Sequence, residues 1–203
     1  MSGGSISGPS DFYFRAFVAP IMDWDDAQPR VQVVARRMDG PPAPGFDCGR
    51  KEQTAFLYER AYGDQQAGVS VTYLYYVKGI LAAYATICMD ALPLGPDERD
   101  RTVRYQEVGS LKLAQLGVTR SFQRMGVGKL VVADVLDRAK DEAWRVGCRY
   151  VTLDAHPDLV GWYEAQGFKR NRLRQQRRVQ DAVAHGRDPA TIAVSMRFDL
   201  RER

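Results

Sequence analysis

Two apolar periods alternate along the chain and predict a mixed α/β fold. Apolar residues return every fourth position at 127, 131, 135 and 139, which predicts an amphipathic helix over 129–146. Runs that alternate apolar and polar residues predict strands at 148–155 and 191–200. Strands and helices that follow one another in this way predict a central sheet with helices on both faces.

The first half of the chain is expected to supply most of the strands. Runs rich in valine, tyrosine and isoleucine at 69–77 and 80–89 flank Lys78-Gly79, a pair that predicts a two-residue hairpin turn. A strand is also expected at 30–38, and a looser alternation at 12–18 predicts an edge strand.

Helices are expected at three further places. One begins at Phe46 and ends between Gly63 and Gly68, and a short one covers 158–166. The segment 169–186 reads either as a helix or as a charged excursion. The polar loop 92–106 is a candidate flap on the substrate side, or a solvated connector.

Length and composition indicate one globular domain. The 203 residues suffice for a sizeable core, and 45% hydrophobic with 27% charged residues is ordinary for such a domain. We expect a domain over 30–203 with a basic excursion at 169–190, and a partly disordered extension over 1–29. No apolar run approaches a membrane span, and the first ten residues lack the pattern of a signal peptide, so a cytoplasmic location is expected.

The three cysteines argue against two kinds of site. Cys48, Cys88 and Cys148 are odd in number and widely spaced, which argues against a disulfide framework and against a zinc cage. We expect buried or half-buried thiols and no metal.

The segment 113–128 carries the most informative motif. An apolar strand that ends at Val118 is followed by a glycine turn, 123–128, and then by the long amphipathic helix. Backbone N–H groups of such a turn converge without obstruction by Cβ atoms, and the helix N-terminus adds partial positive charge. The motif predicts a pyrophosphate site; the alternative is a glycine turn that serves packing alone.

The spacing Gln123-x-x-Gly126-x-Gly128 after a strand resembles the acetyl-CoA loop of the GNAT superfamily of N-acetyltransferases. The helix 129–146, the strand 150–155 and the segment 162–168 continue the order of that family, so the resemblance covers about residues 45–170. It implies the GNAT fold, with a mixed central sheet and a splayed pair of parallel strands that binds acetyl-CoA. A dinucleotide fingerprint would need a third glycine where Val131 stands.

The resemblance also implies which residues bind the cofactor. The strand end would pair with pantetheine, a free N–H near Gly117 or Val118 would face the thioester carbonyl, and Gly117 would leave room for the cofactor. The turn and the first helical residues would bind the pyrophosphate. The implied set is Leu116, Gly117, Val118, Gln123, Arg124, Met125, Gly126, Val127, Gly128 and Lys129.

Tyr163 is the implied proton donor to the thiolate that leaves. It lies in the sequence Tyr-Glu-Ala-Gln-Gly-Phe, as in the GNAT pattern, and a phenol with an ordinary pKa near 10 is protonated at neutral pH. The alternative is a core aromatic. No general base stands out: Glu107 reads as solvent-facing, and a structural or surface role is favoured for His156 and His185.

A narrower resemblance concerns the acceptor. Phe46-Asp47-Cys48-Gly49, followed by Phe56-Leu57 and Gln66, is similar to the opening of TacT-type GNAT toxins, although Gln53 or Thr54 stands where these carry a leucine. This resemblance implies the α-amine of aminoacyl-tRNA as acceptor, a ribbon-helix-helix antitoxin as partner, a homodimer and no membrane. The rival hypotheses are acetylation of a small-molecule amine or a protein, and a GNAT module that binds CoA without turnover.

Positive charge is concentrated near the C-terminus. The net charge is +4, and 169–178 contains six cationic residues and no acidic one. These residues are a candidate tRNA surface or the solvated face of a helix. The residues assigned to tRNA are Arg36, Arg37, Arg174, Arg177 and Arg178.

Overall fold

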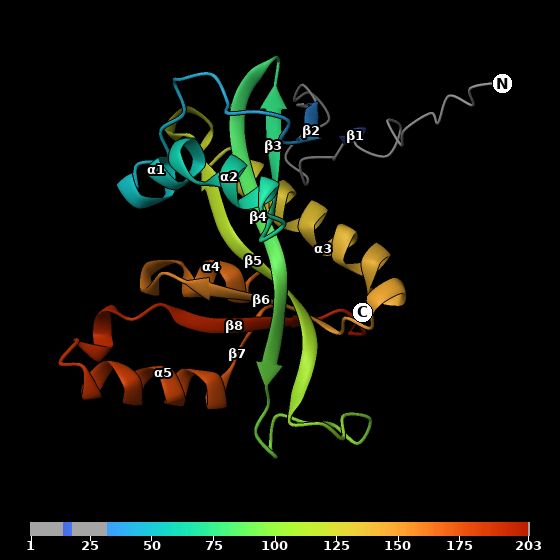
Figure 1. The fold of residues 1–203 in the computed structure, drawn as a ribbon, viewed down its shortest axis with the longest axis vertical. Helices are drawn as coiled ribbons and strands as arrows, with labels where there is room; N and C mark the ends of the chain where they lie inside the picture. The colour runs from blue at the N-terminus through green and yellow to red at the C-terminus, as the bar shows by residue number, and fades with distance from the viewer. Residues whose placement is uncertain (1–13, 18–31, 203) are drawn as a thin grey trace, which may run out of the picture.

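One mixed sheet organises the computed structural model, which describes residues 14–17 and 32–202. Within these residues, eight strands pair in the order β1-β2-β3-β4-β5-β6-β8-β7 (Figure 1). The strands are β1 Phe14–Phe17, β2 Val33–Arg37, β3 Val71–Val77, β4 Ile80–Pro93, β5 Glu107–Val118, β6 Tyr150–Ala155, β7 Lys169–Arg170 and β8 Val194–Asp199. Most of the extension predicted over 1–29 lies outside the described residues.

Neighbouring strands in the described sheet are antiparallel except β5 and β6, which are parallel. The expected mixed sheet is thereby confirmed. The hairpin between β3 and β4 turns at Lys78 and Gly79, whose φ angles of 50° and 78° are those of the predicted two-residue turn. β4 and β5 both extend well beyond the sheet centre, and the loop 94–106 joins them at their far end.

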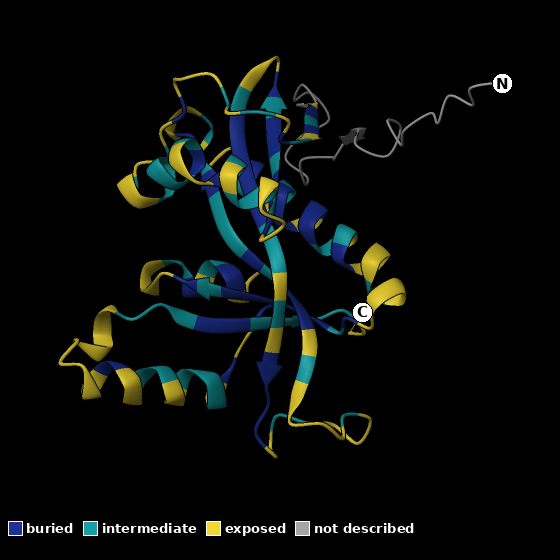
Figure 2. Ribbon diagram, in the orientation of Figure 1, coloured by how far each residue is buried: buried dark blue, intermediate teal, exposed yellow. Residues whose placement is uncertain are grey.

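Helices cover both faces of the sheet, as expected. α1 (Lys51–Glu59) and α2 (Ala61–Gln66) pack on the face that carries Leu74 and Tyr84. α3 (Val127–Val146) packs on the opposite face, which carries Tyr75 and Val77. Figure 2 shows buried residues in the first turns of α3 and exposed residues in its C-terminal turns.

The prediction of a single helix from Phe46 was wrong in two respects. The helix begins only after Arg50, because Gly49 has a φ of +83° and its N–H donates to the Asp47 carboxylate at 2.7 Å. It is also interrupted at Arg60, whose φ of −125° is not helical.

The C-terminal elements agree with the sequence pattern. A 3₁₀ turn, Pro157–Leu159, leads into α4 (Val160–Glu164), and the charged segment forms α5 (Arg172–Ala184). Two further 3₁₀ turns cover Arg120–Phe122 and Pro189–Thr191.

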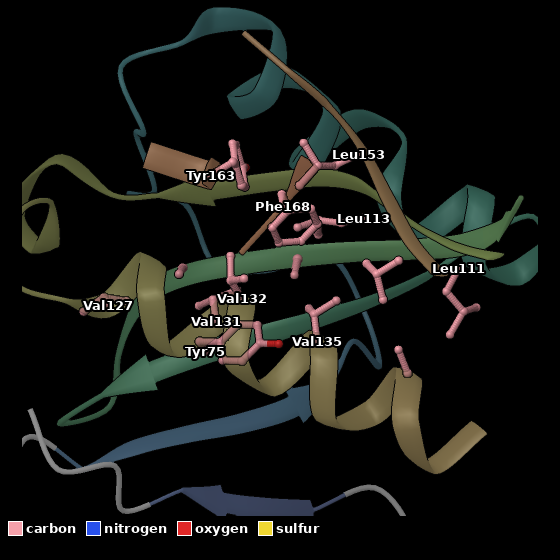
Figure 3. Packing of buried hydrophobic residues seen from close by; sticks show 14 of the residues in the cluster. Tyr75, Leu111, Leu113, Val127, Val131, Val132, Val135, Leu153, Tyr163 and Phe168 are labelled. Atoms are coloured by element: carbon pink, nitrogen blue, oxygen red, sulfur yellow. The ribbon is translucent and has the colours of Figure 1, made fainter. Parts of the chain in front are cut away.

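The main core lies between α3, the sheet and α4. Figure 3 shows Val131 and Val135 of α3 facing Tyr75, with Leu113, Leu153 and Phe168 in the same cluster. The thiol prediction is confirmed, since Cys148 is buried, Cys48 and Cys88 are half-buried, and all three are free. None of the described helices is long and apolar enough to cross a membrane.

Candidate active site

β5 and β6 separate part of the way along their length. Their parallel pairing runs from Ser110 opposite Tyr150 to Leu113 opposite Leu153 and then stops. β5 continues to Val118, paired with β4 alone. A bulge accompanies the separation, because Ala114 has no partner between the pairs formed by Leu113 and Gln115 with β4. The described strands therefore contain the expected splayed pair, with one edge of 114–118 facing no neighbouring strand.

A pocket of about 100 Å³ lies where the strands separate. The end of β5 forms one wall, the end of β6 and α4 form the opposite wall, and α1 contributes its first turn. The lining residues are Arg50, Gln53, Leu113, Ala114, Gln115, Leu116, Leu153, Asp154, His156, Leu159 and Tyr163.

Tyr163 belongs both to this pocket and to the core. Its side chain is 6% exposed, and its ring meets Trp162 and Phe168 edge-on at 4.8 and 5.7 Å between centroids. Its hydroxyl forms no hydrogen bond with any residue that the structure describes. Burial raises the pKa of Tyr163 to about 12, so the phenol keeps its proton throughout the neutral range. In Figure 3 Tyr163 lies in the same cluster as Phe168 and Leu153.

The turn before α3 presents backbone donors, as its glycines predicted. Arg124 and Gly126 have φ angles of +62° and +81°, and α3 starts at Val127 without a side-chain cap. The first N–H groups of a helix have no partner within it. Gly126 suits the left-handed conformation because a Cβ atom would be strained there. Binding of an anion at this turn stays a prediction.

The segment 46–49 holds this turn in place. The Arg120 N–H donates to the Asp47 carbonyl at 2.8 Å, and the Arg120 guanidinium binds the Asp47 carboxylate at 2.9 Å. Hydrogen bonds from the Gly49 N–H and from Arg120 lower the pKa of Asp47. The Gln123 amide donates to the carbonyls of Cys48 and Val118, both at 2.9 Å. The sequence did not identify Asp47 and Arg120 as residues that hold the turn. They bind each other, but they lie 73 residues apart along the chain.

The interpretation of Gly117 needs correction. A Cβ atom at this position would come within 2.6 Å of the Tyr84 ring and 3.1 Å of Phe46. The space beside Gly117 is therefore filled by the core under α1, and the glycine makes room for aromatic side chains and not for a cofactor.

The basic surface predicted on α5 also differs from the structure. Arg174 is 15% exposed and binds both Asp90 oxygens, at 2.6 and 3.0 Å, and Arg178 is paired with Asp154. These two residues tie α5 to the sheet, while Arg177 is exposed. Arg36 and Arg37 lie on β2, which β3 and β4 separate from β5, so the structure does not bring them to the pocket.

A charged cluster lies at the rim of the pocket. His156 contacts Asp158 through Nδ1, and the Arg50 guanidinium binds both Asp158 oxygens, at 3.0 and 2.8 Å. Asp154 in the pocket wall accepts a hydrogen bond from Lys112 at 2.7 Å. His185 and Glu107 do not line this pocket. Arg50, Gln53 and Asp154 are lining residues that the sequence did not predict; the only signal was that Asp154 lies at a strand end.

Comparison with known proteins agrees with this geometry. Residues 99–184 match the model of an acetyltransferase (GNAT) domain. No curated protein sequence matches the chain.

Solved structures match over a longer part of the chain. A structure described as a bacterial toxin is 20% identical, with a TM-score of 0.69 over 84% of this chain and 92% of the other. A Tyr-to-Phe mutant of KacT is 19% identical, with a TM-score of 0.61 over 78% and 87%. AtaT complexed with acetyl-methionyl-tRNAfMet is 21% identical, with a TM-score of 0.57 over 61% and 77%. The chain therefore has the GNAT fold, and its residues 99–184 are similar to an acetyltransferase (GNAT) domain.

Proposed function

We propose that the protein is an acetyl-CoA-dependent N-acetyltransferase whose acceptor is the α-amine of aminoacyl-tRNA. The observation that carries the proposal is the position of Tyr163, a protonated phenol without a hydrogen-bond partner among the described residues, in the pocket between the splayed strands. The family match at 99–184 spans β5, β6 and α4, which form walls of this pocket, and it includes the glycine turn that follows β5.

The residues present fit acetyl-CoA at two places. The edge of 114–118 that faces no neighbouring strand offers backbone groups for a pantetheine chain. The uncapped start of α3 offers N–H groups and partial positive charge for a pyrophosphate. Residues 116–118 and 123–129 would hold the molecule. When bound, acetyl-CoA supplies an acetyl thioester whose cleavage leaves a thiolate.

The side chains of the site have separate tasks in this proposal. Tyr163 donates its proton to the leaving thiolate. Gln123 ties the glycine turn to Cys48 and to the end of β5 through its two hydrogen bonds. Arg50, held by Asp158, and Gln53 shape the side of the pocket from which the acceptor amine enters. The amine needs little help to lose a proton, because an α-amino group has a pKa of about 7.7 to 8.0.

Related structures support the acceptor and a partner. AtaT was solved with acetyl-methionyl-tRNAfMet, and also with the C-terminus of its antitoxin AtaR and acetyl-CoA. We extend the proposal to an antitoxin of the ribbon-helix-helix class, to a homodimeric enzyme and to action in the cytoplasm, where charged tRNA is found. The domain over 30–203, preceded by an extension, is part of the same proposal.

Mass spectrometry of charged tRNA tests the proposal. A total pool of aminoacyl-tRNA is incubated with the protein and acetyl-CoA, and the aminoacyl ends are released and analysed. We expect N-acetylated amino acids with the wild type and at least a hundredfold less with Tyr163→Phe. Unmodified tRNA, together with acetylation of free amines, would instead favour a small-molecule acceptor.

A further inference from the structure

A second, larger pocket lies at the other end of β5. It has a volume of about 540 Å³, is open to solvent, and is lined by the loop 94–106 on one side and by α5 on the other. Figure 1 shows this loop at the far end of the long β4–β5 hairpin, at the bottom of the view and away from the end of β5 where the strands separate. The lining residues are Pro93, Leu94, Gly95, Pro96, Arg99, Tyr105, Gln106, Glu107, Leu173 and Arg177.

Two guanidinium groups in this pocket have no partner among the described residues. The Nε atom of Arg99 is buried without a hydrogen bond, and Arg177 forms no ion pair there. The neighbouring arginines are engaged: Arg172 with Asp97, Arg197 with Glu98 and Arg149 with Asp100. Glu107 is the only carboxylate among the lining residues. The unused donors and the surplus of positive charge suit a phosphate group.

An exposed aromatic ring accompanies the two arginines. Tyr105 lines the pocket and is 77% exposed, although a tyrosine is ordinarily at least half-buried. Guanidinium groups beside an exposed ring are the combination that binds single-stranded nucleic acid, because the phosphates pair with arginine and a base stacks on the ring.

The pocket is also held in shape before any ligand binds. The Glu98 carboxylate accepts hydrogen bonds from the N–H groups of Arg172 and Leu173, at 2.8 and 3.0 Å, and from Gly95 at 3.2 Å. It thereby fastens the loop to the first turn of α5, so the two walls keep their spacing.

The distance between this pocket and the pocket that contains Tyr163 indicates a long ligand. Glu107 lines the second pocket and Ala114 lines the first, and both belong to β5. The two residues are seven positions apart along the strand, which is roughly 23 Å. A small amine cannot reach both pockets, whereas a polynucleotide with a reactive amine at its end can.

We propose that this second pocket binds the sugar-phosphate backbone of the RNA acceptor, with Arg99 and Arg177 on a phosphate and Tyr105 against a base. The proposal rests on the proposed function for the identity of the polymer. It moves the RNA contact from Arg174 and Arg178, which are paired with carboxylates, to the loop 94–106 and the exposed side of α5.

Two variants test the pocket. Arg99→Gln/Arg177→Gln removes both guanidinium groups, and Tyr105→Ala removes an exposed ring without disturbing packing. The matched controls are Arg145→Gln and Trp144→Ala, which change exposed side chains on α3. Binding of a deacylated tRNA pool is measured by fluorescence anisotropy between 50 and 200 mM salt, and acetylation is measured on charged tRNA and on methionine amide.

We expect both pocket variants to bind tRNA about tenfold or more weakly than the wild type and the controls. The slope of log affinity against log salt should shrink by about 1 to 2 in the arginine variant. Acetylation should fall on charged tRNA and not on methionine amide. Equal loss on both acceptors would show a damaged fold, and unchanged tRNA binding would show that the pocket is unused; either result overturns the proposal.

Two further outcomes separate the proposals. If a polyglutamate peptide binds the wild type as well as tRNA does, and the same variants weaken both, the pocket is a site for acidic peptides and the RNA assignment is overturned. If tRNA binds and the variants weaken it, but the wild type leaves charged tRNA unmodified, the pocket assignment is supported and the proposed acceptor fails.

Discussion

The amide of Gln123 donates a hydrogen bond to the carbonyl of Cys48, which lies 75 residues earlier, at 2.9 Å. The same amide donates to the Val118 carbonyl at 2.9 Å. Gln123 therefore joins the end of β5, the glycine turn and the segment before α1. A resemblance to acetyl-CoA loops assigns this glutamine to the cofactor, but its side chain is already used within the protein.

The variant Gln123→Leu should loosen the turn without removing a cofactor contact. It leaves two carbonyls without their donor, so we expect the KM for acetyl-CoA to rise about tenfold and the melting temperature to fall by a few degrees. Steady-state kinetics and thermal unfolding measure both effects. Gln180→Leu, an exposed change on α5, is the control. A lower kcat with an unaltered KM would contradict the positioning role.

The pH dependence of the reaction should follow the acceptor and not Tyr163. Burial raises the pKa of Tyr163 to about 12, so this phenol remains a donor at every pH at which the protein is assayed. We expect kcat/KM to rise with pH as the α-amine, with a pKa of about 7.7 to 8.0, loses its proton, and then to stay level to about pH 10. Tyr163→Phe should lower the whole profile by a factor of about 100 to 10,000 without changing its shape.

A second tyrosine, Tyr62, supplies the control for this pH profile. Tyr62→Phe changes a half-buried tyrosine outside the pocket and should leave the profile unaltered. A fall in wild-type rate between pH 9 and 10 that disappears in Tyr163→Phe would mean that the phenol ionises there, contrary to its burial.

The local patterns were sufficient to predict the sheet, α3 and the glycine turn. Each depends on a short period or on φ angles that the local residues determine, as at Gly126. The prediction failed where the answer depends on distant partners. Nothing in 169–178 shows that Arg174 meets Asp90, 84 residues away, or that Gly117 faces Tyr84. Charge counts and glycine positions do not encode tertiary partners, so the basic surface and the role of Gly117 were misplaced.

Glu98 fastens the loop 94–106 to α5, and its removal should destabilise both. Burial opposes ionisation of this carboxyl, but hydrogen bonds from the Leu173, Arg172 and Gly95 N–H groups and the charge of Arg197 outweigh it and lower its pKa. Since its pKa is lower in the folded protein, its contribution is present above the unfolded pKa of about 4.3 and is lost as the pH falls through the folded value. We expect Glu98→Gln to lower stability at pH 7 by about 1 to 3 kcal/mol.

Urea unfolding of Glu98→Gln at pH 7 and at pH 3 measures this effect. The difference from the wild type should be smaller at pH 3, because pH 3 lies below the unfolded pKa of about 4.3, where the contribution of a carboxyl with a lowered folded pKa decreases. Glu142→Gln, on the exposed side of α3, should match the wild type at both values. An equal loss at both pH values would show that the charge of Glu98 does not matter.

The pair formed by Arg174 and Asp90 should stabilise the fold. Burial opposes ionisation of Asp90, but hydrogen bonds from Arg174 and Thr152 outweigh it and hold the pKa of this carboxyl below its usual value. Arg174→Met leaves a carboxylate that is 17% exposed without its partner, which costs roughly 3 kcal/mol. Arg177→Met, one turn further along α5 and exposed, should cost less than about 0.5 kcal/mol.

Thermal and urea unfolding of Arg174→Met, Arg177→Met and Asp90→Asn/Arg174→Met distinguish the cost of an unpaired carboxylate from the cost of losing an arginine side chain. Because the loss in Arg174→Met comes from the unpaired carboxylate, Asp90→Asn/Arg174→Met should recover a large part of it. If Arg174 instead faced RNA, Arg174→Met would keep the wild-type stability and lose tRNA affinity as Arg99→Gln/Arg177→Gln does. Arg174 should thus control stability, whereas Arg177 of the same helix should control the salt dependence of tRNA binding.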